Sequence, residues 1–199
     1  TYAFTPLRSQ RLTDLLSRTV GTGKHWSRNE SVFMDGTVSV GGRTIDFADA
    51  PGHQGHTVSS LSPPAEWTWV QCNDFAEDGS AVLEALRLDD KLSLCFRVGG
   101  EVYPLNRLQH VHPLSPTANE LERDEVGHWR FAGAGEGIEL EATVESPEGC
   151  WQTVSYKVPD DSLRYNAHCS LSAVTVTYTK GGETRTLTSD AGRAEWVST

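Results

Sequence analysis

Two histidines in a glycine-rich stretch are the residues of this sequence best suited to proton transfer. The stretch 51–73 reads PGHQGHTVSSLSPPAEWTWVQCN and contains His53 and His56. Imidazole titrates near neutral pH, so either side chain could act as a general acid or base. His168 could approach the same site, although its surroundings favour an ordinary turn residue. We therefore expect acid–base chemistry to centre on residues 53–56.

Four aromatic and amide side chains follow with the spacing of a β-strand. Successive side chains of a strand alternate between its faces, which places Trp67, Trp69, Gln71 and Asn73 together. Indoles supply apolar walls and can stabilise a cation, and carboxamides can orient a carbonyl or hydroxyl group. We expect this face to line the interior of a barrel that binds a ligand. The alternative is a core strand with its two amides at the solvated end. Glu66 falls on the opposite face and is a weaker candidate.

Metal binding is the other chemistry that the histidines could support. His53 and His56 form an HxxH pair, and His110 and His112 form an HxH pair. Neutral imidazoles suit zinc, iron or copper, so two such pairs could share a metal ion. The HxH arrangement of cupins requires a glutamate a few residues later, where this sequence has PLSP. We expect no metal and no cofactor, and we assign these histidines to loops and strand ends.

The elements that must position these residues are predominantly β-strands. Alternating runs turn back at Gly41-Gly42, Gly99-Gly100 and Gly181-Gly182, and a glycine pair between such runs is typical of a β-hairpin. About ten short strands without intervening helices favour an all-β, antiparallel barrel or sandwich. Loops are expected at 49–64 and 112–127. The other alternating runs are 67–73, 82–88, 138–144, 152–158 and 193–197.

The first 30 residues differ from the rest in charge. They carry a net charge of +3, whereas residues 31–199 carry −13. Thr5 and Pro6 suit the start of a helix, and Leu12, Leu15 and Leu16 share one face of it. We predict a short basic N-terminal helix and connector over 1–30 and a β-barrel domain over 31–199. The cations of this helix would offset the acidic body, and a lid or a partner-docking helix is the alternative.

The composition excludes several classes of protein. The chain has 199 residues and a net charge of −10, which disfavours binding to the phosphates of nucleic acids. No apolar run reaches the roughly 18–20 residues that a transmembrane segment needs. The four cysteines form no CxxC pair, so we expect reduced thiols in a cytoplasmic protein. Neither a GxSxG elbow nor a phosphate-binding loop is present.

The stretch 51–73 resembles the tocopherol cyclase family and the related carotenoid hydratase and AttH-like proteins. Those families have a glycine-rich turn, a His-Asn-Trp-Gly element and then a strand of the form Trp-x-Trp-x-Gln-x-Asn. Pro51-Gly52 matches the turn and His56 matches the histidine, whereas Thr57-Val58-Ser59 stands in place of Asn-Trp-Gly. The resemblance implies a lipocalin-like (calycin) form of the predicted barrel or sandwich. The residues that match the strand are Trp67, Trp69, Gln71, Cys72 and Asn73.

By this resemblance the chain is expected to be a cyclase that acts on a hydrophobic polyene or a prenylated substrate held in the barrel. His56 matches the motif and is the first choice for the proton donor, with His53 second. The two indoles would hold the substrate, and Gln71 and Asn73 would fix its oxygenated end. A pericyclic reaction would use the same shape without a proton donor. The alternatives are a hydratase of the same family, a non-catalytic binding protein for a hydrophobic small molecule, and a β domain with a packed interior.

Overall fold

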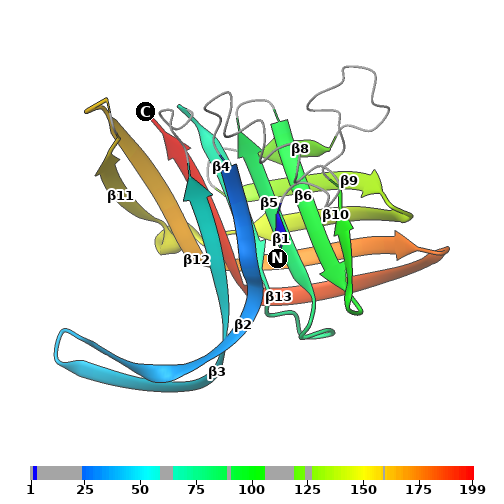
Figure 1. Ribbon diagram of the computed structural model, residues 1–199, viewed down its shortest axis with the longest axis horizontal. Helices are drawn as coiled ribbons and strands as arrows, with labels where there is room; N and C mark the ends of the chain where they lie inside the picture. The colour runs from blue at the N-terminus through cyan, green and yellow to red at the C-terminus, as the bar shows by residue number, and fades with distance from the viewer. Residues whose placement is uncertain are drawn as a thin grey trace.

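The protein is built from two antiparallel β-sheets (Figure 1). The computed structural model describes residues 2–3, 24–58, 65–88, 91–105, 119–123, 127–158 and 160–199. The predicted N-terminal helix and the pair His110 and His112 lie outside these residues. The smaller sheet has the order β1-β2-β3, and its strands are β1 (Tyr2–Ala3), β2 (Lys24–Val40) and β3 (Arg43–Val58).

The larger sheet contains ten strands. Its order is β7-β6-β5-β4-β13-β12-β10-β9-β8, and β11 pairs with β12 beside this path. A short 3-10 helix, η2 (Glu148–Cys150), precedes β11. The part of the chain that the structure describes contains no helix long and apolar enough to cross a membrane. The strands of this sheet are β4 (Trp67–Cys72), β5 (Val82–Leu88), β6 (Lys91–Val98), β7 (Glu101–Pro104), β8 (Glu120–Arg123), β9 (His128–Gly135), β10 (Ile138–Glu145), β11 (Gln152–Lys157), β12 (Leu163–Lys180) and β13 (Glu183–Ser198).

Three hairpins turn at the glycine pairs that the sequence predicts. β2 and β3 join at Gly41-Gly42, whose φ angles of 58° and 78° lie in the left-handed region that glycine adopts without steric cost. Gly99-Gly100 joins β6 to β7 in the same way, and Gly181-Gly182 joins β12 to β13. Every strand pair in both sheets is antiparallel, so the all-β antiparallel prediction is confirmed.

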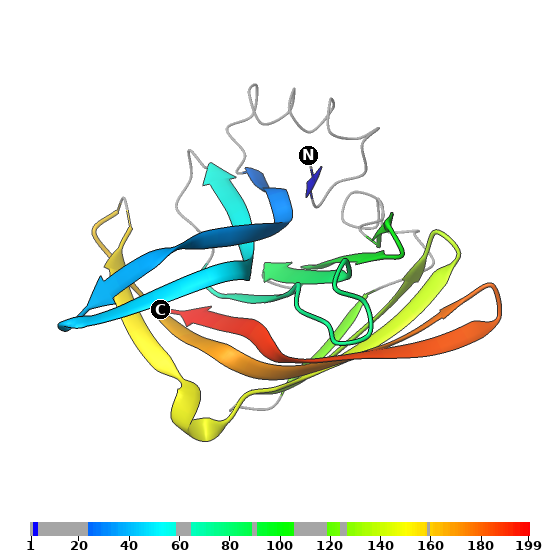
Figure 2. The same cartoon turned by 90° about the horizontal axis from the view of Figure 1, so that it is seen from below.

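The larger sheet folds over on itself and encloses the hydrophobic core (Figure 2). Phe96 of β6 and Tyr178 of β12 meet across this core, with ring centroids 5.2 Å apart. Lys180 at the end of β12 forms an ion pair of 2.5 Å with Glu101 at the start of β7. We call the side of the sheet that carries this core the inner face and the opposite side the outer face.

The folded sheet is an open sandwich. At the two ends of its main path, β7 and β8 each pair with one neighbour and not with each other among the described residues. The sandwich alternative therefore describes the fold better than a closed barrel. Apolar side chains fill the inner face, and the largest fully buried ones are Phe96, Phe131, Leu83, Leu94, Leu105 and Ile138.

Two segments that the sequence predicts as loops contain strands. β3 continues to Val58 and so occupies much of the predicted loop 49–64. Among the described strands β3 pairs on one side only, with β2, which leaves room for Pro51. Pro51 is the register partner of Phe33, between two shifts of the β2–β3 ladder. β8 lies within the predicted loop 112–127. β2 also begins at Lys24 and continues past residue 30, where the sequence predicts a domain boundary.

All four cysteines are free thiols. Cys72, Cys95 and Cys169 are buried, and Cys150 is half-buried. Burial raises the pKa of the Cys72 thiol, which keeps it in its unreactive protonated form. These cysteines therefore pack in the fold as small apolar side chains.

Candidate functional site

β4 presents a different chemistry on each of its faces. Val70 and Cys72 point to the inner face and belong to the hydrophobic core. The alternating residues Trp67, Trp69 and Gln71 therefore lie on the outer face. The sequence grouped these residues correctly, but the prediction that they line the interior of a barrel is wrong. The interior is packed with apolar side chains that could not satisfy a buried carboxamide.

β3 covers part of this outer face. The side-chain amide nitrogen of Asn73 donates a hydrogen bond of 2.6 Å to the backbone oxygen of Gly52, and both residues are buried. A Cβ atom at Gly52 would lie 2.4 Å from Cε of Met34 and 3.1 Å from Cγ2 of Val32, so a larger residue there would require the end of the Met34 side chain to move. Asn73 therefore fastens the two sheets together.

A histidine and a carboxylate meet beneath β3. Nε2 of His53 lies 3.6 Å from Oε1 of Glu84 on β5, and the exposed fractions of the two side chains are 8% and 1%. The indole nitrogen of Trp69 donates a hydrogen bond of 3.1 Å to the same carboxylate oxygen. The rings of His53 and Trp69 also pack with centroids 5.8 Å apart. A carboxylate this deeply buried requires such partners, because burying an unpaired charge is costly.

Gln71 is held in one orientation by an arginine from β13. Arg193 is its ladder partner, and Nη1 of Arg193 donates a hydrogen bond to Oε1 of Gln71. A guanidinium can only donate, so the carbonyl end of the amide must face Arg193. The amide nitrogen Nε2 is buried and has no hydrogen-bond partner among the described residues. On its other side, Gln71 has Glu84 of β5 as its ladder partner. Gln71 therefore lies between the positive charge of Arg193 and the negative charge of Glu84 on the outer face.

Trp67 lies farther along the same face, away from His53. Its ring packs against Tyr156 of β11 with centroids 6.3 Å apart. Burial, followed by the nearby Glu195 carboxylate, raises the pKa of Tyr156. The structure therefore brings together four of the predicted site residues, namely His53, Trp69, Gln71 and Asn73, and places Trp67 at the edge of the cluster.

The remaining candidates have separate surroundings. The backbone of His56 pairs with Trp26, and the side chain of His56 lies outside the described part of the chain. Glu66 forms an ion pair with Arg123 of β8, which agrees with its expected position on the face opposite Trp67. His168 lies in β12 rather than in a turn, so the prediction of a turn residue is wrong. Its partner is Glu195, which is also the ladder partner of Trp69.

Sequence reasoning missed Glu84 and Arg193. Glu84 shares the outer face of β5 with Val82 and Leu86, which are two residues away on either side. A charged residue between two apolar ones on the same face of a strand could have marked Glu84 as a candidate site residue. Arg193 gave no such signal, because its contact with Gln71 spans 122 residues of sequence. Finding it requires the pairing of β4 with β13.

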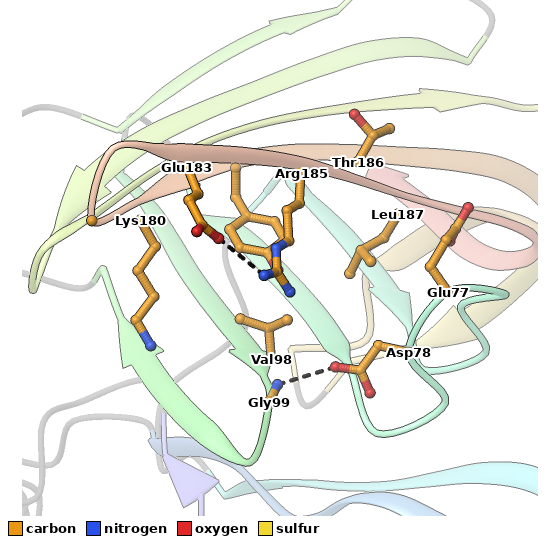
Figure 3. A pocket seen from close by; sticks show the side chains of 11 residues that line it. Glu77, Asp78, Val98, Gly99, Lys180, Glu183, Arg185, Thr186 and Leu187 are labelled. Atoms are coloured by element: carbon orange, nitrogen blue, oxygen red, sulfur yellow. Dashed lines mark hydrogen bonds and ion pairs between the residues drawn. The ribbon is translucent and has the colours of Figure 1, made fainter.

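A cavity of about 810 Å³ opens elsewhere, between the turn of β6 and β7 and the hairpin of β12 and β13 (Figure 3). Val98, Tyr178 and Leu187 form its apolar lining. Arg185 forms an ion pair of 3.0 Å with Glu183 in its lining (Figure 3). Lys180 pairs with Glu101, and Glu77 accepts hydrogen bonds from Thr188. None of the predicted site residues whose side chains the structure describes lines this cavity.

Asp78, beside the cavity, ties the loop before β5 to the turn of β6 and β7. Its carboxylate accepts hydrogen bonds from the backbone and hydroxyl of Ser80. It also accepts one from the backbone nitrogen of Gly99 (Figure 3). These bonds, the Ser80 hydroxyl first, lower the pKa of Asp78. A pKa lower in the folded state than in the unfolded state stabilises the fold above the unfolded value, near pH 4, and this contribution is lost as the pH falls through the folded value.

We therefore expect Asp78→Ala to flatten the acid limb of the stability curve below about pH 4. Wild type loses this contribution on acidification, whereas the variant lacks it at every pH. Denaturant titrations at a series of pH values measure the difference, with the exposed Asp190→Ala as the matched control. Parallel acid limbs for wild type and Asp78→Ala would contradict the assignment.

Comparison with known proteins gives no match. No family model fits the chain, and no curated protein or solved structure is significantly similar to it. Among the described residues there is also no group of three or more His, Cys, Asp or Glu side chains that could hold a metal ion.

Proposed function

We propose that this chain is a cyclase or isomerase that transfers a proton to a hydrophobic polyene or prenylated substrate. The site is the outer face of β4 and β5 beneath β3. The single observation that carries the proposal is the contact of His53 with the buried Glu84 and the ring of Trp69. A carboxylate beside an imidazole favours its protonated form, which is the state that can protonate an alkene.

The surroundings of His53 support the choice of substrate. Protonation of an alkene creates a carbocation, and the faces of Trp69 and Trp67 can stabilise such a charge. The same indoles offer apolar surface to a polyene chain. The amide nitrogen of Gln71 is a fixed donor for an oxygen at the end of the substrate.

A binding protein for a hydrophobic small molecule is the second candidate. The unpartnered amide of Gln71 favours it, because recognition of a ligand oxygen needs a donor and no titrating group. The two functions differ in whether the ligand leaves the protein chemically changed.

Incubation with a prenylated hydroquinone in D₂O, followed by mass spectrometry of the extracted product, tests the proposal. Proton-initiated cyclisation gives an isomer of the substrate with one non-exchangeable deuterium. Hydration adds the mass of a water molecule, and a pericyclic reaction leaves no deuterium in the product. A binding protein returns the substrate unchanged but quenches tryptophan fluorescence on binding. Unchanged substrate across a panel of prenylated and polyene probes would contradict the enzyme proposal.

A further inference from the structure

A serine, a histidine and a glutamate form a hydrogen-bonded chain on β12 and β13. Nε2 of His168 lies 2.6 Å from Oγ of Ser170, and Nδ1 of His168 lies 3.0 Å from Oε1 of Glu195. A carboxylate can only accept, so Nδ1 carries a hydrogen that it donates to Glu195. The lone pair of Nε2 then faces the hydroxyl of Ser170. This is the arrangement in which a histidine acts as a base toward a serine.

The backbone at Ser170 is irregular in a way that serves such chemistry. β12 pairs with β11 up to His168 and with β10 from Ala173 onward. The ladder with β13 shifts register between Cys169 and Ser172, so Ser170 and Leu171 have no ladder partner among the described strands. Bulges of this kind redirect side chains beside active sites. They also leave N–H groups outside the ladder, where they can bind an oxyanion.

The surroundings of Ser170 are accessible to a substrate. Ser170 is exposed, and the neighbouring Leu171 exposes 62% of its surface although it is apolar. The acid and the base are more sheltered, with exposed fractions of 24% for Glu195 and 31% for His168. An exposed nucleophile beside an apolar side chain fits an ester whose acyl group is small and apolar.

We propose that Ser170 is a nucleophile for the hydrolysis of carboxylic esters. Its Oγ forms a bond to the acyl carbon while the hydroxyl proton passes to Nε2 of His168. The bond from the acyl carbon to the alcohol oxygen then breaks, and the same proton passes to that oxygen. Water attacks the acyl-serine and gives a proton to Nε2. The acid is released when the acyl bond to Ser170 breaks and the proton returns to Oγ. Glu195 is a positioning residue that holds the imidazole.

Labelling with a fluorophosphonate tests the nucleophile directly. The serine oxygen bonds to phosphorus, fluoride leaves, and His168 takes the proton. We expect one label per chain, located by peptide mass spectrometry on Ser170, and none on Ser170→Ala. Ser155→Ala, which removes an exposed serine of the neighbouring β11, should label like wild type. His168→Gln should slow labelling at least about 100-fold.

The role of Glu195 needs a pair of variants. Glu195→Asp keeps the carboxylate and should retain more of the labelling rate than Glu195→Gln, which keeps the size of the side chain. A purely structural role would not favour the shorter side chain. The same order is expected for hydrolysis of p-nitrophenyl butyrate. An unlabelled wild type, a label on another residue, or a labelling rate unaffected by His168→Gln would overturn the proposal.

Discussion

Replacing His53 by glutamine is expected to lower turnover of a prenylated substrate by about 10²–10⁴-fold. Glutamine fills similar space but cannot transfer a proton at neutral pH. Substrate affinity should change little, because the indoles of Trp67 and Trp69 and the amide of Gln71 remain in place. Product formation and fluorescence quenching, measured on the same preparation, separate the two effects.

The matched control for His53→Gln is His128→Gln. His128 is exposed at the start of β9 and lies outside the proposed site, so its replacement should preserve turnover. Thermal unfolding of both variants shows whether a loss of activity follows a loss of structure. Unchanged turnover in a folded His53→Gln protein would remove His53 from the mechanism and return attention to His56.

Replacing Phe96 by alanine is expected to lower the free energy of unfolding by about 3–5 kcal/mol. Phe96 is fully buried and meets Tyr178 at the centre of the folded sheet. Its removal leaves a cavity between two layers that the surrounding strands cannot close, because their backbones are fixed by the ladder. Denaturant titration of wild type and variant measures the loss.

Phe33→Ala provides the comparison for the Phe96 variant. The chemical change is identical, but Phe33 lies on β2 and exposes 68% of its surface. We expect a loss below about 0.5 kcal/mol there, as for most surface substitutions. Similar losses at both positions would show that the inner face is not the principal core of the protein.

Local sequence signals determined much of this fold. Gly41-Gly42 and the two similar pairs predict their hairpins because the turn requires positive φ angles. Strict alternation predicts β10 because it has a consistently apolar side, and it predicts β4 from the spacing of its two tryptophans. Alternation failed for β3, where Gly52 and Pro51 resemble loop residues. They are accommodated by a one-sided pairing that only the fold reveals.

The candidate site was predictable only in part. Period-2 spacing placed Trp67, Trp69 and Gln71 on one face, but it contains no information about which face packs on the core. Both sides of β4 are largely buried, the inner one by apolar side chains and the outer one partly by β3. Glu84 and Arg193 reach Gln71 through pairings between distant strands, so they required the topology of the larger sheet.

The open ends of the larger sheet affect how the protein behaves at high concentration. An exposed strand edge can pair with the edge of another molecule and start aggregation. Here β7 and β8 are four residues each, which leaves little backbone for such pairing. Pro104 closes β7 without a backbone donor, and Glu120 and Glu122 give β8 two like charges. The shortness of these two strands, together with Pro104, therefore disfavours growth of the larger sheet by pairing of a second copy at β7 or β8.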